Sequence, residues 1–162
     1  MSLIELALKL PNRPGALAAI ARLLAEAKIN LAAISVDSTG KVGSVRLIVS
    51  DPSAAALLLE SSGYPVEQRE MLAVHLEDRA GSFLKVLDVL AEAKVNIRSV
   101  AILVAREGSH SLVGLLTDDS AKARRLLQQA GFISEKAERL VSNSDLVAAA
   151  PAIPAESVGL LL

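Results

Sequence analysis

The chain has 162 residues, of which 52% are hydrophobic and 22% charged, and its 17 Lys and Arg residues nearly balance its 18 Asp and Glu residues. This balance excludes a polybasic nucleic-acid surface and an acidic disordered tail over most of the length. The lack of cysteine excludes disulfides, thiol nucleophiles and cysteine-ligated metal sites. No apolar run approaches the roughly 20 residues that cross a bilayer, and charges interrupt the N-terminal MSLIELALKL, so we expect a cytoplasmic protein without a membrane partner.

The chain repeats itself. Residues 12–31 and 78–97 align without a gap, and eight of these twenty positions are identical. Such a repeat predicts two copies of one folding unit. We therefore expect one domain over residues 1–70 and a second over 71–138. The remaining Ala- and Pro-rich tail, 139–162, is compatible with a docked arm, disorder or a partner contact, and we assign no function to it.

The first unit begins with a predicted strand, because apolar side chains alternate with others over residues 6–10. Pro14 and Gly15 then open a segment in which apolar residues recur at helical spacing. The β-branched stretches 29–36 and 42–49 enclose a turn, and together they predict a β-hairpin.

A second helix is predicted to start at Asp51, an N-cap residue followed by proline, and to end at Gly63 before a short strand over 64–69. The second unit follows the same order. Its predicted elements are a strand over 72–76, a helix after Gly81, a hairpin from 95–104 and 111–116, a helix capped by Asp118 or Asp119 and ended by Gly131, and a strand over 132–137. Each unit is therefore an α+β, ferredoxin-like βαββαβ arrangement, with two helices on one face of a four-stranded antiparallel sheet.

Several functions of βαββαβ folds can be tested against the composition. An RNA-recognition module needs aromatic residues on its open sheet face, but the only aromatics are Tyr64, Phe83 and Phe132, and none falls on a central predicted strand. A soft-metal carrier needs cysteines, which are lacking. An acylphosphatase needs a cationic phosphate cradle, for which Arg13 and Arg79 are weak candidates.

The loop over residues 12–17 ends a predicted strand and starts a helix. The free backbone amides of the first helical turn would favour an anion there, and a carboxylate suits them. Gly15 and its counterpart Gly81 lack a side chain where a ligand would approach the backbone. The alternative is that proline and glycine only shape a tight turn.

Two asparagines recur with the loops. Asn30 and Asn96 lie 18 residues beyond Asn12 and Asp78, where each first helix gives way to the second strand. Asparagine can be a turn residue that tolerates left-handed backbone. Alternatively, the four polar groups could donate and accept hydrogen bonds at the two charged ends of an α-amino acid.

The segments NRPGAL and AEAKINL closely resemble the ACT domain, a small regulatory module attached to amino-acid biosynthetic enzymes, and residues 3–138 resemble a stand-alone tandem ACT protein. This resemblance implies an amino acid bound at an interface between two domains. If the copies pair about a pseudo-twofold axis, Asn12 would join Asn96 at one site. Asp78 would join Asn30 at the other. By position, the implied ligand-binding residues are Asn12, Pro14, Gly15, Ala16, Leu17, Asn30, Leu31, Asp78, Ala80, Gly81, Ser82, Phe83, Asn96 and Ile97.

The second copy departs from the family pattern. Ala80 replaces the loop proline and Asp78 the loop asparagine, and Leu10 and Leu76 stand where some amino-acid-binding members have a histidine. A carboxylate at Asp78 could bind an ammonium group but would repel a carboxylate beside it. The two sites are therefore expected to differ in affinity.

We predict a non-enzymatic regulator that binds a small amino acid or a related carboxylate between ACT domains and transmits an allosteric signal. A homodimer is also predicted, because the helix-free sheet face carries Ala7, Met71 and Ala73. His75 and His110 are expected at solvated or interface positions, so no catalytic site, metal or cofactor is expected. The alternative is a module without a ligand that assembles with a metabolic enzyme. No nucleic-acid partner is expected.

Overall fold

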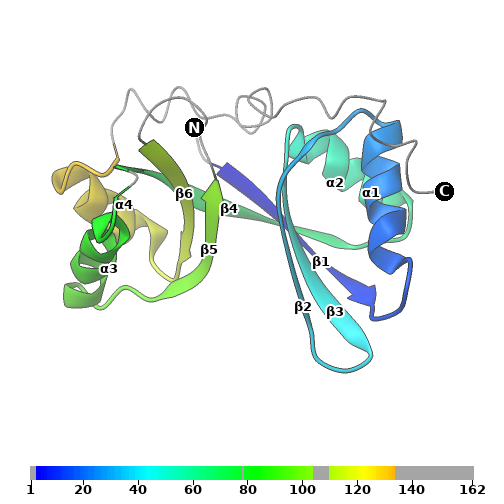
Figure 1. Cartoon of the computed structure of the whole chain (residues 1–162), viewed down its shortest axis with the longest axis horizontal. Helices are drawn as coiled ribbons and strands as arrows, with labels where there is room; N and C mark the ends of the chain where they lie inside the picture. Colours follow the sequence, from blue (N-terminus) through cyan, green and yellow to red (C-terminus); the bar gives the residue numbers. More distant parts are fainter. Residues whose placement is uncertain (1–2, 78, 104–109, 134–162) are drawn as a thin grey trace.

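The computed structural model describes residues 3–77, 79–103 and 110–133. Its elements are β1 (Leu3–Pro11), α1 (Ala16–Glu26), β2 (Leu31–Ser38), β3 (Val42–Val49), α2 (Pro52–Ser61), β4 (Val66–Glu77), α3 (Ser82–Glu92), β5 (Ile97–Leu103), β6 (His110–Thr117) and α4 (Ser120–Gln129). The strands form a six-stranded antiparallel sheet in the order β2-β3-β1-β4-β6-β5. In Figure 1 the sheet is curved, and the helices cover its outer side at the two ends of the molecule. None of the described helices is long and apolar enough to cross a membrane.

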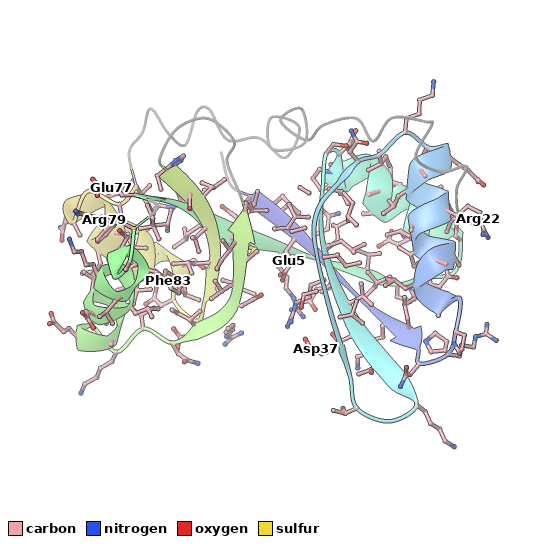
Figure 2. All side chains as sticks on the ribbon, in the orientation of Figure 1. Glu5, Arg22, Asp37, Glu77, Arg79 and Phe83 are labelled. Atoms are coloured by element: carbon pink, nitrogen blue, oxygen red, sulfur yellow. The ribbon has the colours of Figure 1, made fainter. Side chains whose placement is uncertain are left out.

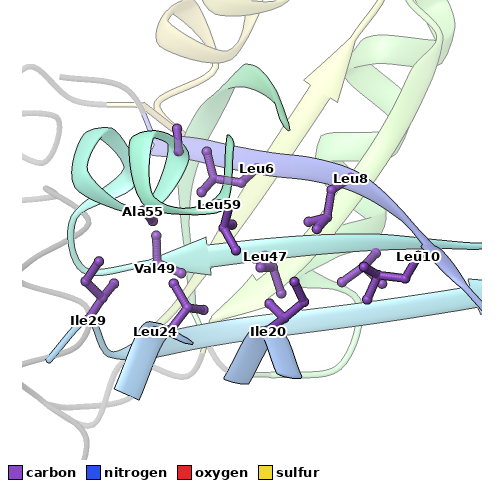
Figure 3. Close-up of a cluster of buried hydrophobic side chains, with 12 residues drawn as sticks. Leu6, Leu8, Leu10, Ile20, Leu24, Ile29, Leu47, Val49, Ala55 and Leu59 are labelled. Atoms are coloured by element: carbon purple, nitrogen blue, oxygen red, sulfur yellow. The ribbon is translucent and has the colours of Figure 1, made fainter. Parts of the chain in front are cut away.

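The first unit confirms the alternation predicted for its first strand. Leu6, Leu8 and Leu10 of β1 are all buried on the helix side of the sheet, where they pack with Ile20 and Leu24 of α1 (Figure 3). The predicted hairpin is also present, because β2 pairs with β3 in antiparallel register. Strand period and helix period thus direct one set of side chains into a common core.

The second unit repeats this arrangement. Its core joins alternate residues of β4, from Leu72 to Leu76, to Val86 and Leu90 of α3. Helix α4 is capped by Asp119, which resolves the choice that the sequence left open. The turn predicted between β5 and β6 lies outside the described residues.

The two predicted four-stranded sheets are instead joined into one by β4. This strand pairs with β1 from Val66 to Met71 and with β6 from Leu72 to Glu77. The separate strands predicted over 64–69 and 72–76 are therefore wrong, because β4 contains no glycine or proline that would break it. The strand predicted over 132–137 extends beyond the described residues, although the backbone N–H of His75 donates to Phe132 O at 3.2 Å.

The concave side of the sheet encloses a third apolar cluster, here called the seam, where the two units pack on each other. Its buried members are Leu3, Ile48, Met71, Ala73, Leu103 and Leu112. Met71 is fully buried and Ala73 and Ala7 nearly so. The prediction that these residues form an exposed dimerisation face is therefore wrong, because the curvature of the sheet covers them within one chain.

Candidate functional site at the glycine loops

The four helices begin in two different ways. Helices α1 and α3 start at Gly15 and Gly81, which have left-handed φ values of 83° and 84° and provide no side-chain cap. Helices α2 and α4 start at Asp51 and Asp119, whose carboxylates each accept a hydrogen bond from a first-turn backbone N–H. The left-handed conformation explains why glycine occupies the first two positions. Among the described helices, only those that start at the two glycines leave the positive end of the helix without an acceptor side chain.

Most first-turn amides of α1 and α3 are free. Ala16 N donates to Arg13 O at 3.3 Å, and Ser82 N donates to Arg79 O at 3.2 Å. Within the described ranges, four further amides have no acceptor: Leu17, Ala18, Phe83 and Leu84. A Cβ atom placed on Gly15 would meet no described atom within 4 Å, so the space beside this amide group is open.

The polar residue of the first loop is anchored to its own unit. Asn12 Nδ2 donates to Gly40 O at 2.8 Å, and its backbone N–H donates to Lys41 O at 2.9 Å. These bonds hold the loop against the β2–β3 turn and use the two nitrogens of Asn12 but not its Oδ1 atom. Its counterpart, Asp78, lies outside the described residues.

The asparagines at the start of the edge strands are fixed by their backbones. Asn30 N donates to Ser50 Oγ at 3.0 Å, and Asn96 N donates to Asp118 Oδ1 at 3.0 Å. Ser50 N and Asp118 N each donate back to the asparagine carbonyl. Both asparagines are exposed, so their side-chain amides lie at the surface.

The alternative interpretation, that these asparagines occupy turn positions with left-handed backbone, is wrong. The non-glycine residues with positive φ are Lys28 and Lys94, at 58° and 56°, among the described part of the chain. Asparagine is therefore not needed at Asn30 or Asn96 to accommodate left-handed backbone. Its side chain remains available for a contact.

The structure does not bring the loop of one unit to the second strand of the other. Leu3 lies in the seam, and the loop follows Pro11 at the far end of β1, eight residues or roughly 27 Å away. The hydrogen bonds of Asn12 stay in the first unit and those of Asn96 in the second. In Figure 1 the helices that begin at the two loops lie at opposite ends of the molecule. Pairing of these residues within one chain is therefore not observed.

The second loop borders a cavity of about 520 Å³. Its lining includes Arg79, Ser82 and Lys85, and Figure 2 shows Arg79 close to Glu77 at this end of the molecule. Arg79 Nε lies 2.7 Å from Glu77 Oε2. Glu77 lines the same cavity, so the space beside the start of α3 carries an Arg79–Glu77 ion pair and the cationic Lys85.

The remaining predicted site residues lie around the same two helix starts and edge strands. Pro14, Leu17, Leu31 and Ala80 are exposed, Ala16, Phe83 and Ile97 are half-buried, and Ser82 is buried. His75, expected at a solvated or interface position, is half-buried and lines the cavity beside Ser82. The described residues contain no cluster of His, Cys, Asp or Glu that could hold a metal ion.

Sequence reasoning missed one residue that the structure singles out. Glu5 lies in the middle of the molecule in Figure 2 and is only 2% exposed. The available signal was the comparison of the copies, because the equivalent residue 66 positions later is Met71. Beside Glu5 on β4, Arg69 donates to Glu67 Oε2 at 2.6 Å, and this hydrogen bond lowers the pKa of the Glu67 carboxyl.

Comparisons with known proteins agree with this fold. The family model described as "ACT domain pair" matches residues 1–144. The structure of protein BT0572 from Bacteroides thetaiotaomicron has a TM-score of 0.78 and 24% identity, and the match covers 91% of this chain and 96% of that chain. The ligand-free regulatory subunit of aspartate kinase from Thermus thermophilus has a TM-score of 0.59 and 19% identity, with 80% and 93% covered. The corresponding subunit from Thermus flavus has a TM-score of 0.54 and 19% identity, with 81% and 94% covered.

Among curated protein sequences, none matches this chain significantly. The family model nevertheless extends from the first strand through the last described helix. The match therefore includes both copies of the repeat and both glycine loops. The chain therefore belongs to the ACT domain pair family.

Proposed function

We propose that this ACT domain pair is a non-catalytic regulatory protein that binds a small amino acid, or a related carboxylate, at its glycine loops. Binding would act as an allosteric signal in amino-acid metabolism, in the cytoplasm. The observation that carries this proposal is the contrast between helix starts, because α1 and α3 begin at uncapped glycines while α2 and α4 carry aspartate caps. Free amides at a helix N-terminus favour an anion, and the carboxylate of an amino acid satisfies them.

The structural relatives support a regulatory role. The Thermus thermophilus protein with this fold is the regulatory subunit of an aspartate kinase. A regulator needs a ligand whose binding free energy differs between two states, and couplings between sites are typically about 1–3 kcal/mol. By analogy, the present chain would transmit its signal by associating with a metabolic enzyme such as a kinase.

The ammonium end of the ligand needs an acceptor near the loops. Asn12 Oδ1 provides one in the first unit, and Asp78 has the right chemistry in the second. The cavity beside the second loop adds Lys85, whose charge favours a carboxylate, next to the Arg79–Glu77 ion pair. We therefore expect the second loop to bind more tightly than the first.

A second copy of the chain would complete each site. Strands β2 and β5 are the two edges of the sheet, and both expose large β-branched side chains: Ile34, Val36, Val100 and Ile102. Unpaired apolar edges favour pairing with another chain. Asn30 and Asn96 directly precede these strands, so a homodimer formed through the edges would place the partner's asparagine amides beside the loops. This arrangement replaces the pairing within one chain that the sequence suggested.

The test is calorimetry of the wild-type chain against the twenty amino acids, followed by a Gly15→Val and Gly81→Val double variant. We expect at least one amino acid to bind at the loops with micromolar to millimolar affinity and the double variant to lose that loop binding, because valine side chains would fill the open space beside the amides. Gly63→Val is the matched control, since Gly63 also has positive φ and open surroundings but lies at the end of α2. Equal loss in the control would mean that backbone strain, not the site, causes the effect.

The exposed edge strands also favour a second function, that of an assembly module without a ligand. The same double variant separates the two possibilities when its oligomeric state is measured by light scattering. Loss of ligand binding with unchanged assembly supports regulation by an amino acid. A wild-type chain that binds none of the twenty amino acids, but forms a stable dimer, supports the assembly module.

A further inference from the structure

Glu5 is a buried acid at the boundary of the seam. It lies on the concave side of β1, and its side chain is 3% exposed. Glu5 Oε1 accepts a hydrogen bond from Ser99 Oγ at 3.1 Å, which links the first unit to the second across the seam. The side chain is thus held in place by a residue 94 positions away in the sequence.

The other oxygen of Glu5 is not satisfied. Within the described part of the chain, Glu5 Oε2 has no hydrogen-bond partner, and the Arg69 Nη1 atom is 4.0 Å away. Arg69 donates its short hydrogen bond to Glu67, at 2.6 Å, and its contact with Glu5 is only a long ion pair. A buried carboxylate oxygen without a donor is costly, and a protein normally supplies a partner for it. The missing donor at Oε2 therefore requires an explanation.

A cavity of about 160 Å³ lies beside Glu5, between the edge strands of the two units. This is roughly five times the volume that one water molecule occupies in the liquid. Arg46 lines the same cavity, and its Nη2 atom donates to Ser35 Oγ at 2.9 Å and to Asp37. The rest of the guanidinium keeps unused donors, because arginine carries five N–H groups in all.

The outer walls of the cavity are formed by exposed aliphatic side chains from both halves of the molecule. Ile34 of β2 lies on one side, and Val100 and Ile102 of β5 lie on the other. The space therefore has an acidic group, a basic group and aliphatic walls within a small volume. This combination matches both charged ends and the side chain of a small zwitterion.

We infer that the cavity beside Glu5 binds a small aliphatic α-amino acid, with the ligand ammonium on Glu5 Oε2 and the ligand carboxylate on Arg46. This site is separate from the glycine loops and goes beyond the function proposed above. Its occupant would touch β2 of the first unit and β5 of the second, so it would hold the edges of the curved sheet at a fixed separation.

The repeat shows that the acid is not required by the fold. The second copy has Met71 where the first has Glu5, and Met71 is fully buried in the seam. A buried charge is often replaceable by an apolar side chain of similar size without loss of stability. Its retention in one copy therefore points to a ligand.

The test is calorimetry of the full chain with glycine, L-alanine and L-valine as probes. Propionate and ethylammonium serve as probes that each carry one charge. We expect at least one amino acid to bind, and both single-charge probes to bind at least about tenfold more weakly, since each loses a charge-assisted contact. Glu5→Gln should weaken binding of the amino acid by about tenfold or more, because the glutamine amide keeps the shape of the side chain but lacks its charge.

Glu70→Gln is the matched control, since Glu70 also lies on β4 opposite β1 but is exposed and does not line this cavity. It should leave affinity within about twofold. If Glu5→Gln fails to fold, Glu5→Met is the second variant, which we expect to fold with a raised Tm and without amino-acid binding in this cavity. Unchanged binding in a folded Glu5 variant overturns the inference. So does an equal loss in Glu70→Gln, or a wild-type chain that binds none of the three amino acids.

Amide chemical shifts distinguish this site from the loops. Binding in the cavity should perturb Ser99 and Ala101 and should persist in the Gly15→Val and Gly81→Val double variant. Perturbation confined to Leu17 and the first turn of α3, with loss in the double variant, would overturn the seam site and leave the proposed function intact. If none of the twenty amino acids shifts the loop amides, but one of them shifts Ser99 and Ala101, the proposed function is contradicted and the seam site is supported.

Discussion

The packing of the two units on each other can be tested at Gly114, a buried glycine in the middle of β6. A Cβ atom at this position would lie 2.8 Å from Leu3 Cδ2 and 3.3 Å from Met71 Sδ. Leu3 and Met71 are fully buried, so neither side chain has free space into which to move. Overfilling a packed interior lowers the free energy of unfolding by about 1–3 kcal/mol. Replacing glycine also makes the unfolded chain less flexible, which raises the free energy of unfolding by about 0.4–1 kcal/mol. Gly114→Ala should therefore lower the free energy of unfolding by about 1–2 kcal/mol.

The assay is urea unfolding followed by circular dichroism. Gly43→Ala is the control, because Gly43 is also a buried strand glycine, but the nearest atom that its Cβ would meet is Ser38 Cβ, at an ordinary contact distance of 3.4 Å. It should cost clearly less. The Gly114→Ala and Leu3→Ala double variant should show a favourable coupling of about 0.5 kcal/mol or more, since the smaller residue makes room. A Gly114→Ala chain as stable as wild type, or a Gly43→Ala chain equally destabilised, would refute the seam packing described above.

Two further substitutions test local features. Thr117 is 5% exposed, and its Oγ1 atom has no hydrogen-bond partner within the described residues. Val49 occupies the equivalent place in the first unit. Thr117→Val should therefore raise the free energy of unfolding, measured by urea titration, by about 1 kcal/mol. An unchanged or lower value would mean that the hydroxyl is satisfied. Asp119→Ala should lower the free energy of unfolding by about 1 kcal/mol in the same assay, because it removes the N-cap carboxylate that accepts a hydrogen bond from Lys122 N. An unchanged free energy of unfolding would contradict the difference between capped and uncapped helix starts on which the proposed site depends.

The individual helices and strands of the first unit were predictable because their signals are local. The alternation from Leu6 to Leu10 and the Asp51–Pro52 start of α2 each depend on neighbouring residues, and the structure confirms both. The continuity of β4 was missed because the repeat suggested a boundary at residue 70. The uninterrupted stretch from Val66 to Glu77, without glycine or proline, was the signal that could have indicated one strand.

The arrangement of the units was not predictable from the same signals. The apolar open face containing Met71 and Ala73 was evident, but a hydrophobic pattern does not say whether a face is covered by the same chain or by another copy. Burial of Glu5 depends on Ser99 and on the edge strands of both units, which only the folded sheet brings together. The glycine loops could be identified from sequence because the helix that follows each one exposes its amides by local geometry.

The central claim is that the first-turn amides of α1 and α3 bind the carboxylate of an amino acid. The most direct measurement is a ¹⁵N chemical-shift titration of the wild-type chain with the amino acid that binds in the calorimetric screen. We expect the largest shifts at the free amides of Leu17, Ala18, Phe83 and Leu84, and little change at the capped starts of α2 and α4. Saturating binding that leaves these four amides unperturbed would contradict it.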